Sequence, residues 1–364
     1  MGRHDTEYMQ RALRLAERGL YTTDPNPRVG CVIVKDNRIV GEGWHRWAGE
    51  PHAEILALQQ AGELAAGATV YVSLEPCSHH GKTPPCADAL VSAGVSRVIA
   101  AMKDPNPEVA GKGFERLRNH GINVEIGLLE QAARSINPGF ISRMESGRPF
   151  VRIKLAASLD GRTAMASGES QWISGEAARA DVQRLRARSS VIMTGVDTVI
   201  DDDPSLNVRL SATQLGIEGN VRQPHRVVLD SQQRFPSDAK MLTLEGKTTL
   251  LTTKQDNGSL SCDVVRLDEV DGRLDLGSVM NWLSGLQANE VHVEAGATLC
   301  GALLNSKLVD EIVVYIAPHI MGCDARGLFK IPGLEHMADR IRLDIKDVRQ
   351  VGKDLRITAI PADD

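Results

Sequence analysis

The chain has 364 residues, of which 42% are hydrophobic and 24% charged, with a formal net charge of −5. This composition is near the average for folded soluble proteins, and the length suits two domains. The chain has no basic run of five or more residues and no apolar stretch approaching about 18 residues, so we expect no nucleic-acid partner and no membrane span.

The first nineteen residues form an amphipathic helical pattern without an apolar core segment or a cleavage-type sequence. We therefore expect no secretory signal. The six cysteines are spread along the chain and do not suggest a disulfide framework. The cytoplasm is the expected location, and the sequence leaves open whether the protein forms a homo-oligomer.

The first half alternates strand-like and helix-like patterns. After the opening helix, the expected elements are strands at Val29–Val34 and Ile39–Trp44, a helix from His52, a strand at Thr69–Leu74, a helix at Ala87–Ala93, a strand at Arg97–Met102, a helix at Val109–His120 and a strand at Asn123–Ile126. Such alternation predicts a mostly parallel sheet covered by helices.

Polar and breaker residues at Glu145–Pro149 indicate a domain boundary, which we place between residues 147 and 148. Residues 148–364 predict a second α/β domain, with an irregular surface loop at Leu210–Gln223. Its expected elements are strands at Phe150–Ala156, Val191–Thr194, Arg226–Leu229, Thr248–Thr252, Glu290–Glu294 and Glu311–Ile316, and a helix at Thr298–Ser306.

The strongest chemical signal is the triplet H-A-E at residues 52–54, followed by Cys77 and Cys86. One imidazole and two thiolates suit Zn²⁺, and three protein ligands leave a fourth position for water, as in catalytic zinc sites. His52 and Cys86 each stand where a helix is expected to begin, and a helix N-terminus stabilises a thiolate. We therefore predict that His52, Cys77 and Cys86 bind zinc.

Glu54 is the expected proton carrier of this site. Zinc lowers the pKa of bound water towards about 7, and a deaminase also needs a side chain that carries the proton to the leaving amine. Residues two apart on a regular helix point about 200° from each other, so His52 and Glu54 converge only if His52 precedes the helix. A structural zinc clip would not need Glu54. His79 and His80 remain alternative zinc ligands.

These residues resemble the bifunctional riboflavin-biosynthesis deaminase/reductase family. The similarity covers nearly the whole chain, and in the first half its motifs lie at residues 26–30, 52–54, 75–86 and 103–107. The general zinc deaminase signature has two residues between its cysteines. The eight residues between Cys77 and Cys86 are typical of this family instead.

The resemblance implies an α/β protein in two domains. Residues 1–147 would be a cytidine-deaminase-like three-layer α/β/α domain, a zinc-dependent pyrimidine deaminase with Glu54 as proton donor and acceptor. The implied substrate contacts are Asn26, His45, Lys82 and Asn106. Each of the first three has a plainer alternative reading, since Asn26 could be a turn residue, Lys82 a solvated loop charge and His45 a packed surface histidine.

The second half shows no G-x-G-x-x-G motif. The small residues of Glu294–Ala302, at an expected strand end and helix start, either let N–H groups approach a phosphate or form a tight connection. Arg186 and Arg209 either clamp a phosphate bidentately or are solvated. The aspartates at 201–203 are interpreted as a helix-to-loop turn and not as a metal site.

The resemblance implies that residues 148–364 form a dihydrofolate-reductase-like α/β domain that uses NADPH to reduce the ribosyl arm to a ribityl chain. The implied cofactor contacts are Ala156, Trp172, Thr198, Asp202, Ser231, Gly296, Ala297, Thr298, Leu299, Cys300, Gly301 and Ala302. The implied substrate contacts are Ser170, Arg186, Leu206, Arg209 and Glu294. Trp172 is either a pocket wall or a core residue.

The resemblance thus implies a riboflavin enzyme with Zn²⁺ and NADPH as cofactors. Its implied substrate is 2,5-diamino-6-(5-phosphoribosylamino)pyrimidin-4(3H)-one, and its product 5-amino-6-(5-phosphoribitylamino)uracil. Two other readings stay open. One is a zinc deaminase of another small heterocycle with a non-catalytic C-terminal nucleotide-binding module. The other is a non-catalytic scaffold stabilised by zinc.

Overall fold

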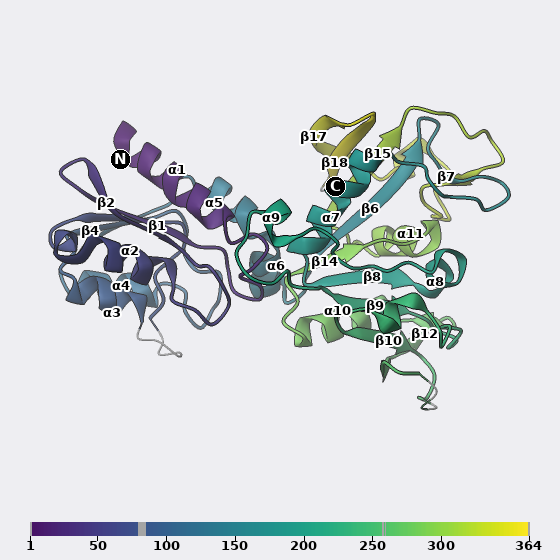
Figure 1. Ribbon diagram of the computed structural model, residues 1–364, viewed down its shortest axis with the longest axis horizontal. Helices are drawn as coiled ribbons and strands as arrows, with labels where there is room; N and C mark the ends of the chain where they lie inside the picture. Colours follow the sequence, from purple (N-terminus) through teal and green to yellow (C-terminus); the bar gives the residue numbers. More distant parts are fainter. Residues whose placement is uncertain (1, 79–84, 257, 259, 363–364) are drawn as a thin grey trace. The chain divides into compact units, whose positions relative to one another are not determined.

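The computed structural model describes residues 2–78, 85–256, 258 and 260–362. The chain divides into two compact units, Met1–Gly147 (unit 1) and Arg148–Asp364 (unit 2) (Figure 1). Each unit has its own central sheet with helices packed on it. The helices of the described chain are all too short or too polar to cross a bilayer.

Unit 1 is built on a five-stranded sheet of order β2-β1-β3-β4-β5. Strand β1 pairs antiparallel with both β2 and β3, whereas β3, β4 and β5 run parallel. The strands are β1 (Gly30–Lys35), β2 (Arg38–Trp44), β3 (Thr69–Val72), β4 (Arg97–Ala100) and β5 (Asn123–Ile126).

The expectation of a mostly parallel sheet is wrong for this unit, because half of its strand pairs are antiparallel. The reason is the turn between β1 and β2. Asp36 and Asn37 both have positive φ, 49° and 59°, and close a two-residue hairpin. A two-residue connection can join only antiparallel strands, and residues with positive φ at both central positions suit it.

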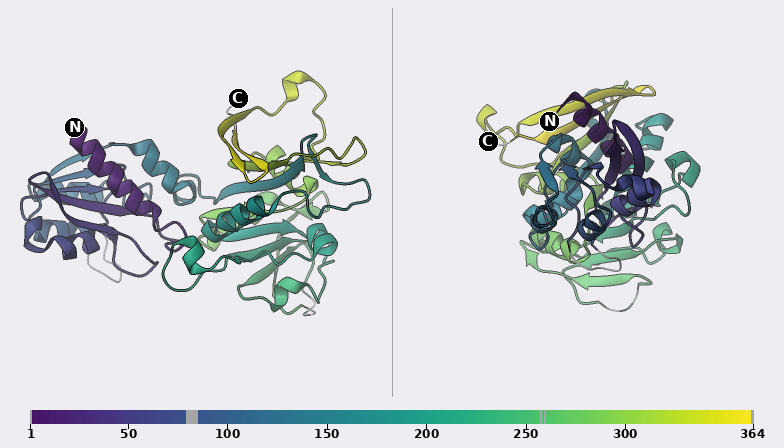
Figure 2. Two further views of the ribbon diagram at one scale, coloured as in Figure 1. Left: turned by 45° about the horizontal axis from the view of Figure 1, so that its top comes forward. Right: turned by 90° about the vertical axis from the view of Figure 1, so that its left-hand side faces the viewer.

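Helices cover both faces of this sheet, in the three-layer arrangement that was expected (Figure 2). One face packs against α1 (Arg3–Glu17), α5 (Glu130–Ile136) and α6 (Pro138–Ser146). The other packs against α2 (Ala53–Ala61), α3 (Cys86–Ser92) and α4 (Lys112–Asn119), and a short 3-10 helix, η1 (Gly62–Ala65), follows α2.

Two glycines of β2 let α2 approach the sheet closely. A Cβ atom on Gly41 would lie 2.2 Å from the Ala57 carbonyl oxygen, and one on Gly43 would lie 2.3 Å from the Ala53 carbonyl oxygen. Any larger residue would therefore push α2 away from β2. This contact fixes the N-terminus of α2, where His52 lies.

Unit 2 is built on a nine-stranded sheet of order β11-β10-β9-β8-β14-β6-β15-β18-β17. The strands from β11 to β15 are parallel, and the β17–β18 hairpin adds an antiparallel edge (Figure 2). The strands are β6 (Phe150–Ser158), β8 (Val191–Gly195), β9 (His225–Leu229), β10 (Thr248–Thr252), β11 (Asp263–Arg266), β14 (Glu290–Val293), β15 (Glu311–Ala317), β17 (Leu343–Val351) and β18 (Asp354–Pro361). Two small ladders pair β7 (Arg162–Ala164) with β16 (Arg326–Gly327) and β12 (Glu269–Val270) with β13 (Arg273–Leu274).

One face of this sheet packs against α10 (Leu276–Gly285) and α11 (Ala297–Asn305), and the other against α7 (Glu176–Arg188) and α8 (Val196–Asp202). Short 3-10 helices lie at η2 (Lys240–Thr243) and η3 (Met337–Asp339). Leu210–Gln223 is not wholly irregular as expected. It contains the one-turn helix α9 (Ala212–Leu215), because Ser211 and Gln214 form a capping box.

The face of β6 and β14 opposite α10 and α11 carries buried charges. Arg152 of β6 is 1% exposed and forms ion pairs with Glu290, at 2.9 Å, and with Glu311. Arg188 of α7 pairs with the same Glu290 at 2.8 Å. Because a buried charge is tolerated only when it is paired, these contacts fix α7 on the sheet.

Candidate active sites

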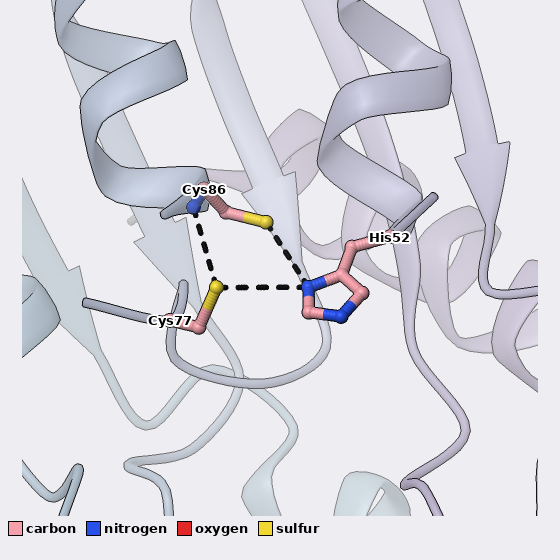
Figure 3. Close-up of side chains that lie close together, drawn as sticks. All are labelled: His52, Cys77 and Cys86. Atoms are coloured by element: carbon pink, nitrogen blue, oxygen red, sulfur yellow. Dashed lines mark hydrogen bonds between the residues drawn. The ribbon is translucent and has the colours of Figure 1, made fainter. Parts of the chain in front are cut away.

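A three-residue cluster in unit 1 has the donor set of a metal site. The ligand atoms of His52, Cys77 and Cys86 all lie within 4.8 Å of one another. His52 Nδ1 is 3.3 Å from Cys86 Sγ and 3.6 Å from Cys77 Sγ, and the three side chains point toward one another (Figure 3). One imidazole and two thiols suit Zn²⁺ and leave room for a fourth ligand.

Local structure explains how these side chains converge. His52 is the N-cap of α2 and has extended backbone angles, φ −72° and ψ 165°. The prediction that it precedes the helix is therefore confirmed. Because His52 does not have helical backbone angles, the helical geometry that would direct the His52 and Glu54 side chains apart does not apply. Cys86 is the first residue of α3, and its N–H donates to Cys77 Sγ at 3.3 Å. Two helix N-termini thus face one loop cysteine.

The surroundings of the cluster favour the ionised thiolate form of Cys77. A hydrogen bond from Cys86 is the main cause that lowers the pKa of Cys77, to about 4, and His52 adds to it. The same thiol–thiol hydrogen bond raises the pKa of Cys86. The two sulfurs therefore share one proton, and Cys77 is the first of them to ionise.

Glu54 lies in the first turn of α2, next to the cluster. Its side chain is 3% exposed, and burial is the main cause that raises its pKa to about 7, with the Cys77 charge adding to the shift. It is also hydrogen bonded to Cys86. A carboxyl group with a pKa near neutrality can both accept and donate a proton at working pH.

Two of the predicted substrate residues meet beside His52. The His45 and His52 rings are edge to face, with centroids 5.4 Å apart. His45 Nδ1 lies 3.3 Å from the Pro51 carbonyl oxygen, and His45 Nε2 lies 3.1 Å from Asn26 Nδ2. A neutral ring satisfies both contacts when Nδ1 donates to Pro51 and Nε2 accepts from Asn26. Burial lowers the pKa of His45, which favours this neutral form.

Asn106 lies in the loop that follows β4. Its N–H donates to Asp104 Oδ1 at 2.8 Å, and its own Oδ1 accepts the Glu108 N–H at 3.0 Å. These bonds fix both the backbone and the side chain of Asn106. Lys82, and the alternative ligands His79 and His80, lie outside the described residues.

In unit 2 several of the predicted cofactor and substrate residues gather at one sheet edge. Ala156, Ser231 and Glu294 lie near the carboxyl ends of β6, β9 and β14, which are parallel strands of one sheet. Thr198 and Asp202 follow in α8. Open α/β sheets bind ligands at this edge.

The turn from β14 into α11 has the form of a phosphate site. Gly296 is the N-cap of α11, and a Cβ there would meet nothing within 4 Å, so the helix N-terminus is open. Ala297, Thr298 and Leu299 begin the helix, and Ala302 is half-buried in its second turn. Two further predicted contacts face inward.

Cys300 is fully buried in the core and donates to the Ala295 carbonyl oxygen at 3.3 Å. A Cβ on Gly301 would lie 2.3 Å from the Lys330 carbonyl oxygen. Gly301 therefore allows the close packing of α11 against the chain at Lys330. Cys300 and Gly301 therefore stabilise the turn from its buried side.

A second segment reaches the same edge. The Ser170 hydroxyl donates to Asp202 Oδ1 at 3.2 Å, which ties residues 170–172 to α8. Trp172 is 71% exposed, and the Arg179 guanidinium lies 4.7 Å from its ring centroid. The alternative that Trp172 is a core residue is therefore wrong.

Arg186 and Glu294 form a buried bidentate pair. Arg186 Nε is 2.5 Å from Glu294 Oε1 and Nη2 is 2.9 Å from Oε2, while Nη1 donates to the Asn207 carbonyl oxygen at 3.0 Å. Burial alone would raise the pKa of Glu294, but Arg186 holds it well below its usual range. Both alternatives for Arg186 are therefore wrong. Glu294 occupies the guanidinium, so Arg186 is not free to clamp a phosphate, and Arg186 is buried and not solvated.

The two remaining substrate candidates flank this pair. Leu206 is 2% exposed and packs in the core with Val196 and Val199, so only its main chain can meet a ligand. The Arg209 N–H donates to Gln183 Oε1 at 2.8 Å, and its side chain is exposed. Desolvation is the main cause that lowers the pKa of Arg209, and the nearby Arg186 charge adds to the effect.

Sequence reasoning missed two residues near the sites. Lys154 of β6 lies close to Glu294 and Arg186. Desolvation lowers the pKa of Lys154, and the Glu294 charge offsets only part of this shift. Cys31 of β1 lies beside Glu54, and burial followed by that carboxylate raises the pKa of Cys31. For Lys154 a signal existed, because charged residues alternate with apolar ones in V-R-I-K-L, residues 151–155.

Comparisons with known proteins give a family match in each unit. The chain matches the family model of the RibD C-terminal domain over residues 149–357. It matches the cytidine and deoxycytidylate deaminase zinc-binding region over residues 3–102. It is 54% identical to the riboflavin biosynthesis protein RibD of Escherichia coli (strain K12), over 98% of this chain and 100% of that protein.

Two solved structures are similar over 99% of this chain and 99% of theirs. Acinetobacter baumannii RibD, form 1, has a TM-score of 0.91 and 48% sequence identity. A Thermotoga maritima protein has a TM-score of 0.87 and 31% identity. It is described as a diaminohydroxyphosphoribosylaminopyrimidine deaminase/5-amino-6-(5-phosphoribosylamino)uracil reductase.

Proposed function

The chain belongs to the RibD family of riboflavin biosynthesis proteins, and we propose that residues 1–147 are its zinc-dependent pyrimidine deaminase domain and residues 148–364 its NADPH-dependent reductase domain. It is a bifunctional enzyme, a deaminase and a reductase, whose cofactors are Zn²⁺ and NADPH. A non-catalytic C-terminal module is thereby set aside, as is a non-catalytic zinc scaffold.

The names carried by the relatives support a specific substrate. We infer that the chain deaminates 2,5-diamino-6-(5-phosphoribosylamino)pyrimidin-4(3H)-one. It then reduces the ribosyl arm of the deaminated product, which gives 5-amino-6-(5-phosphoribitylamino)uracil. The partner is therefore a small phosphorylated pyrimidine.

His52, Cys77 and Cys86 hold the zinc ion in this proposal. Their donor set and mutual distances fit Zn²⁺ with one position left for water. When bound, zinc lowers the pKa of that water to near neutrality.

Glu54 moves the protons of the deamination. As a carboxylate it accepts a proton from the attacking water, and as a carboxylic acid it gives that proton to the departing amine. The pKa of about 7 makes both forms available at neutral pH. Its burial keeps bulk water away from the transferred proton.

Three described residues orient the pyrimidine. Asn26 and His45 hold each other beside His52, and Asn106 is fixed in its loop. Amide and imidazole groups that cannot rotate discriminate between ring edges better than mobile ones do. Lys82 completes this set of substrate contacts.

In the reductase domain, NADPH supplies the hydride when it is bound. The N-terminus of α11 at Gly296 would hold its phosphates, and Ala156, Thr198, Ser231 and Asp202 would line the same edge. Trp172 would form a solvent-exposed wall of the cofactor pocket. The substrate contacts in this proposal are Ser170, Arg209, the main chain of Leu206, and the paired Arg186 and Glu294. Of the two arginines, Arg209 is the cation available for the sugar phosphate, because Glu294 neutralises Arg186.

We also infer a cytoplasmic location. All six cysteines are free thiols in the structure, two of them in the cluster. Free thiols persist in reducing compartments.

The observation that carries the deaminase assignment is the convergence of His52, Cys77 and Cys86 beside the buried Glu54. The test is to incubate the full chain with the diamino-pyrimidinone phosphate, with and without NADPH, and to identify the products by mass spectrometry. Without NADPH we expect ammonia and the deaminated ribosyl compound, and with NADPH the ribityl compound. A deaminated product that NADPH never converts would remove the reductase assignment.

A further inference from the structure

Glu75 is a buried carboxylate that the chemistry above does not use. It is 3% exposed and lies two residues before Cys77. Its side chain accepts four backbone N–H groups. Oε2 accepts those of Asp104 and Gly111 at 3.1 and 2.9 Å, and Oε1 accepts those of Gly113 and Phe114 at 2.9 and 3.3 Å.

These four donors surround the loop that carries Asn106. Asp104 lies near the start of the loop, two residues before Asn106, and Gly111 at its end is the N-cap of α4. The N–H groups of Gly113 and Phe114 belong to the first turn of α4, where a helix has no partners of its own for them. The loop is therefore anchored at both ends by one side chain.

The same side chain joins this loop to the metal-type cluster. A Cβ on Gly113 would lie 2.0 Å from the Pro76 carbonyl oxygen, so the start of α4 rests directly on the peptide between Glu75 and Cys77. Residues 75–77 and 104–114 thus form one rigid joint. Cys77 belongs to the first of these two segments and Asn106 to the second.

We propose that Glu75 is a positioning residue for deamination, which sets the place of Asn106 relative to the cluster of His52, Cys77 and Cys86. The proposal rests on the proposed function of Asn106 as a substrate contact. A carboxylate suits this task, because each oxygen has two lone pairs and can accept two N–H groups. A glutamine would direct amide hydrogens at two of the same donors.

The first test is E75Q in the full-length enzyme. Two buried N–H groups lose their acceptor, which lets the loop shift, so we expect the KM of deamination to rise about tenfold. The zinc content and the reductase rate should stay at the wild-type level. E75D keeps the carboxylate one methylene shorter and should show a smaller rise. E42Q is the matched control, since Glu42 pairs with Arg11 in the same unit, at 2.6 Å, and should leave KM unchanged.

A double-mutant cycle with N106A separates this inference from the proposed function. If Glu75 acts through Asn106, N106A raises KM and E75Q adds little to it. An N106A enzyme with wild-type KM would overturn the substrate role of Asn106, and this inference with it. If N106A raises KM but E75Q alone leaves KM unchanged, the substrate role of Asn106 stands and the inference is overturned. The same conclusion follows if E75Q raises KM as much in the N106A enzyme as in the wild type. Loss of zinc in both E75Q and E75D would also overturn it, because Glu75 would then serve Cys77.

Discussion

The two active sites of this enzyme are assembled in different ways. The proposed zinc site draws its three side chains from residues 52–86, and places them at two helix starts and one loop. The reductase candidates extend from Ala156 to Ala302, and Ala156, Ser231 and Glu294 among them lie near the carboxyl ends of parallel strands in one sheet. The first site depends on local chain geometry, and the second on the order of strands in a sheet.

Their electrostatics differ as well. Among the residues that the structure describes, no arginine or lysine pairs with Glu54, and burial raises its pKa to about 7, so it can exchange protons. Glu294 is buried against Arg186, so its pKa falls and it stays charged. The two glutamates therefore suit opposite roles, Glu54 the proton carrier of our proposal and Glu294 a fixed charge.

The largest effect is expected for E54Q. The amide that replaces the carboxyl group is nearly isosteric but cannot carry a proton, so deamination should fall by about 10³-fold. The zinc content and the NADPH-dependent reductase rate should be unchanged, which would show that the two sites fail separately. Ammonia release measured on the purified full chain is the readout. Near-normal ammonia release would refute the proton-carrier role.

E294Q tests the second site. It leaves Arg186 buried beside a neutral partner, so we expect the reductase kcat/KM to fall by about 10²-fold, with deamination intact. E311Q is the matched control, because Glu311 also pairs with a buried arginine, Arg152, in the same sheet. It should lower the melting temperature without a comparable loss of reductase turnover. Equal losses in both variants would mean that Glu294 has only a structural role.

Asp5 shows how a buried carboxylate acts outside the active sites. Burial alone would raise its pKa, but hydrogen bonds from Tyr71 and Arg97 lower it to about 2. A lowered folded-state pKa contributes stability above the unfolded value near 3.8, and this contribution is lost as pH falls toward 2. D5N should therefore cost unit 1 about 2 kcal/mol at neutral pH and nothing at the acid limit.

The measurement is chemical denaturation of the wild type and D5N between about pH 6 and about pH 3. The difference between the two proteins is the readout, since other carboxylates titrate in both. A pH-independent difference would show that Asp5 contributes through shape and not through charge.

The smallest effect is expected for W172A. Trp172 is 71% exposed, so its removal should not change the melting temperature, but the KM for NADPH should rise about threefold to tenfold if it walls the cofactor pocket. W282A is the control, because Trp282 packs against the core of unit 2. That variant should lose stability and keep its KM for NADPH. An unchanged KM in W172A would remove Trp172 from the cofactor site.

Much of the first site could be predicted from the sequence. The spacing of His52, Glu54, Cys77 and Cys86 indicated a catalytic zinc site, and the need for convergence placed His52 before its helix, as the structure confirms. The roles of these side chains remain predictions. Glu75 was visible only as part of a motif, because its four N–H partners come from residues 104–114.

The sequence by itself determined the alternation of strands and helices, the presence of two α/β units and the donor chemistry of the cluster. Helix starts, turns and ligand types depend on residues a few positions apart, so they can be inferred from local order. The tertiary structure decided the antiparallel β1 pairings, the pairing of Arg186 with Glu294, and the burial of Leu206 and Cys300. Arg186 and Glu294 are 108 residues apart, and only the pairing of strands and the packing of α7 bring such side chains together.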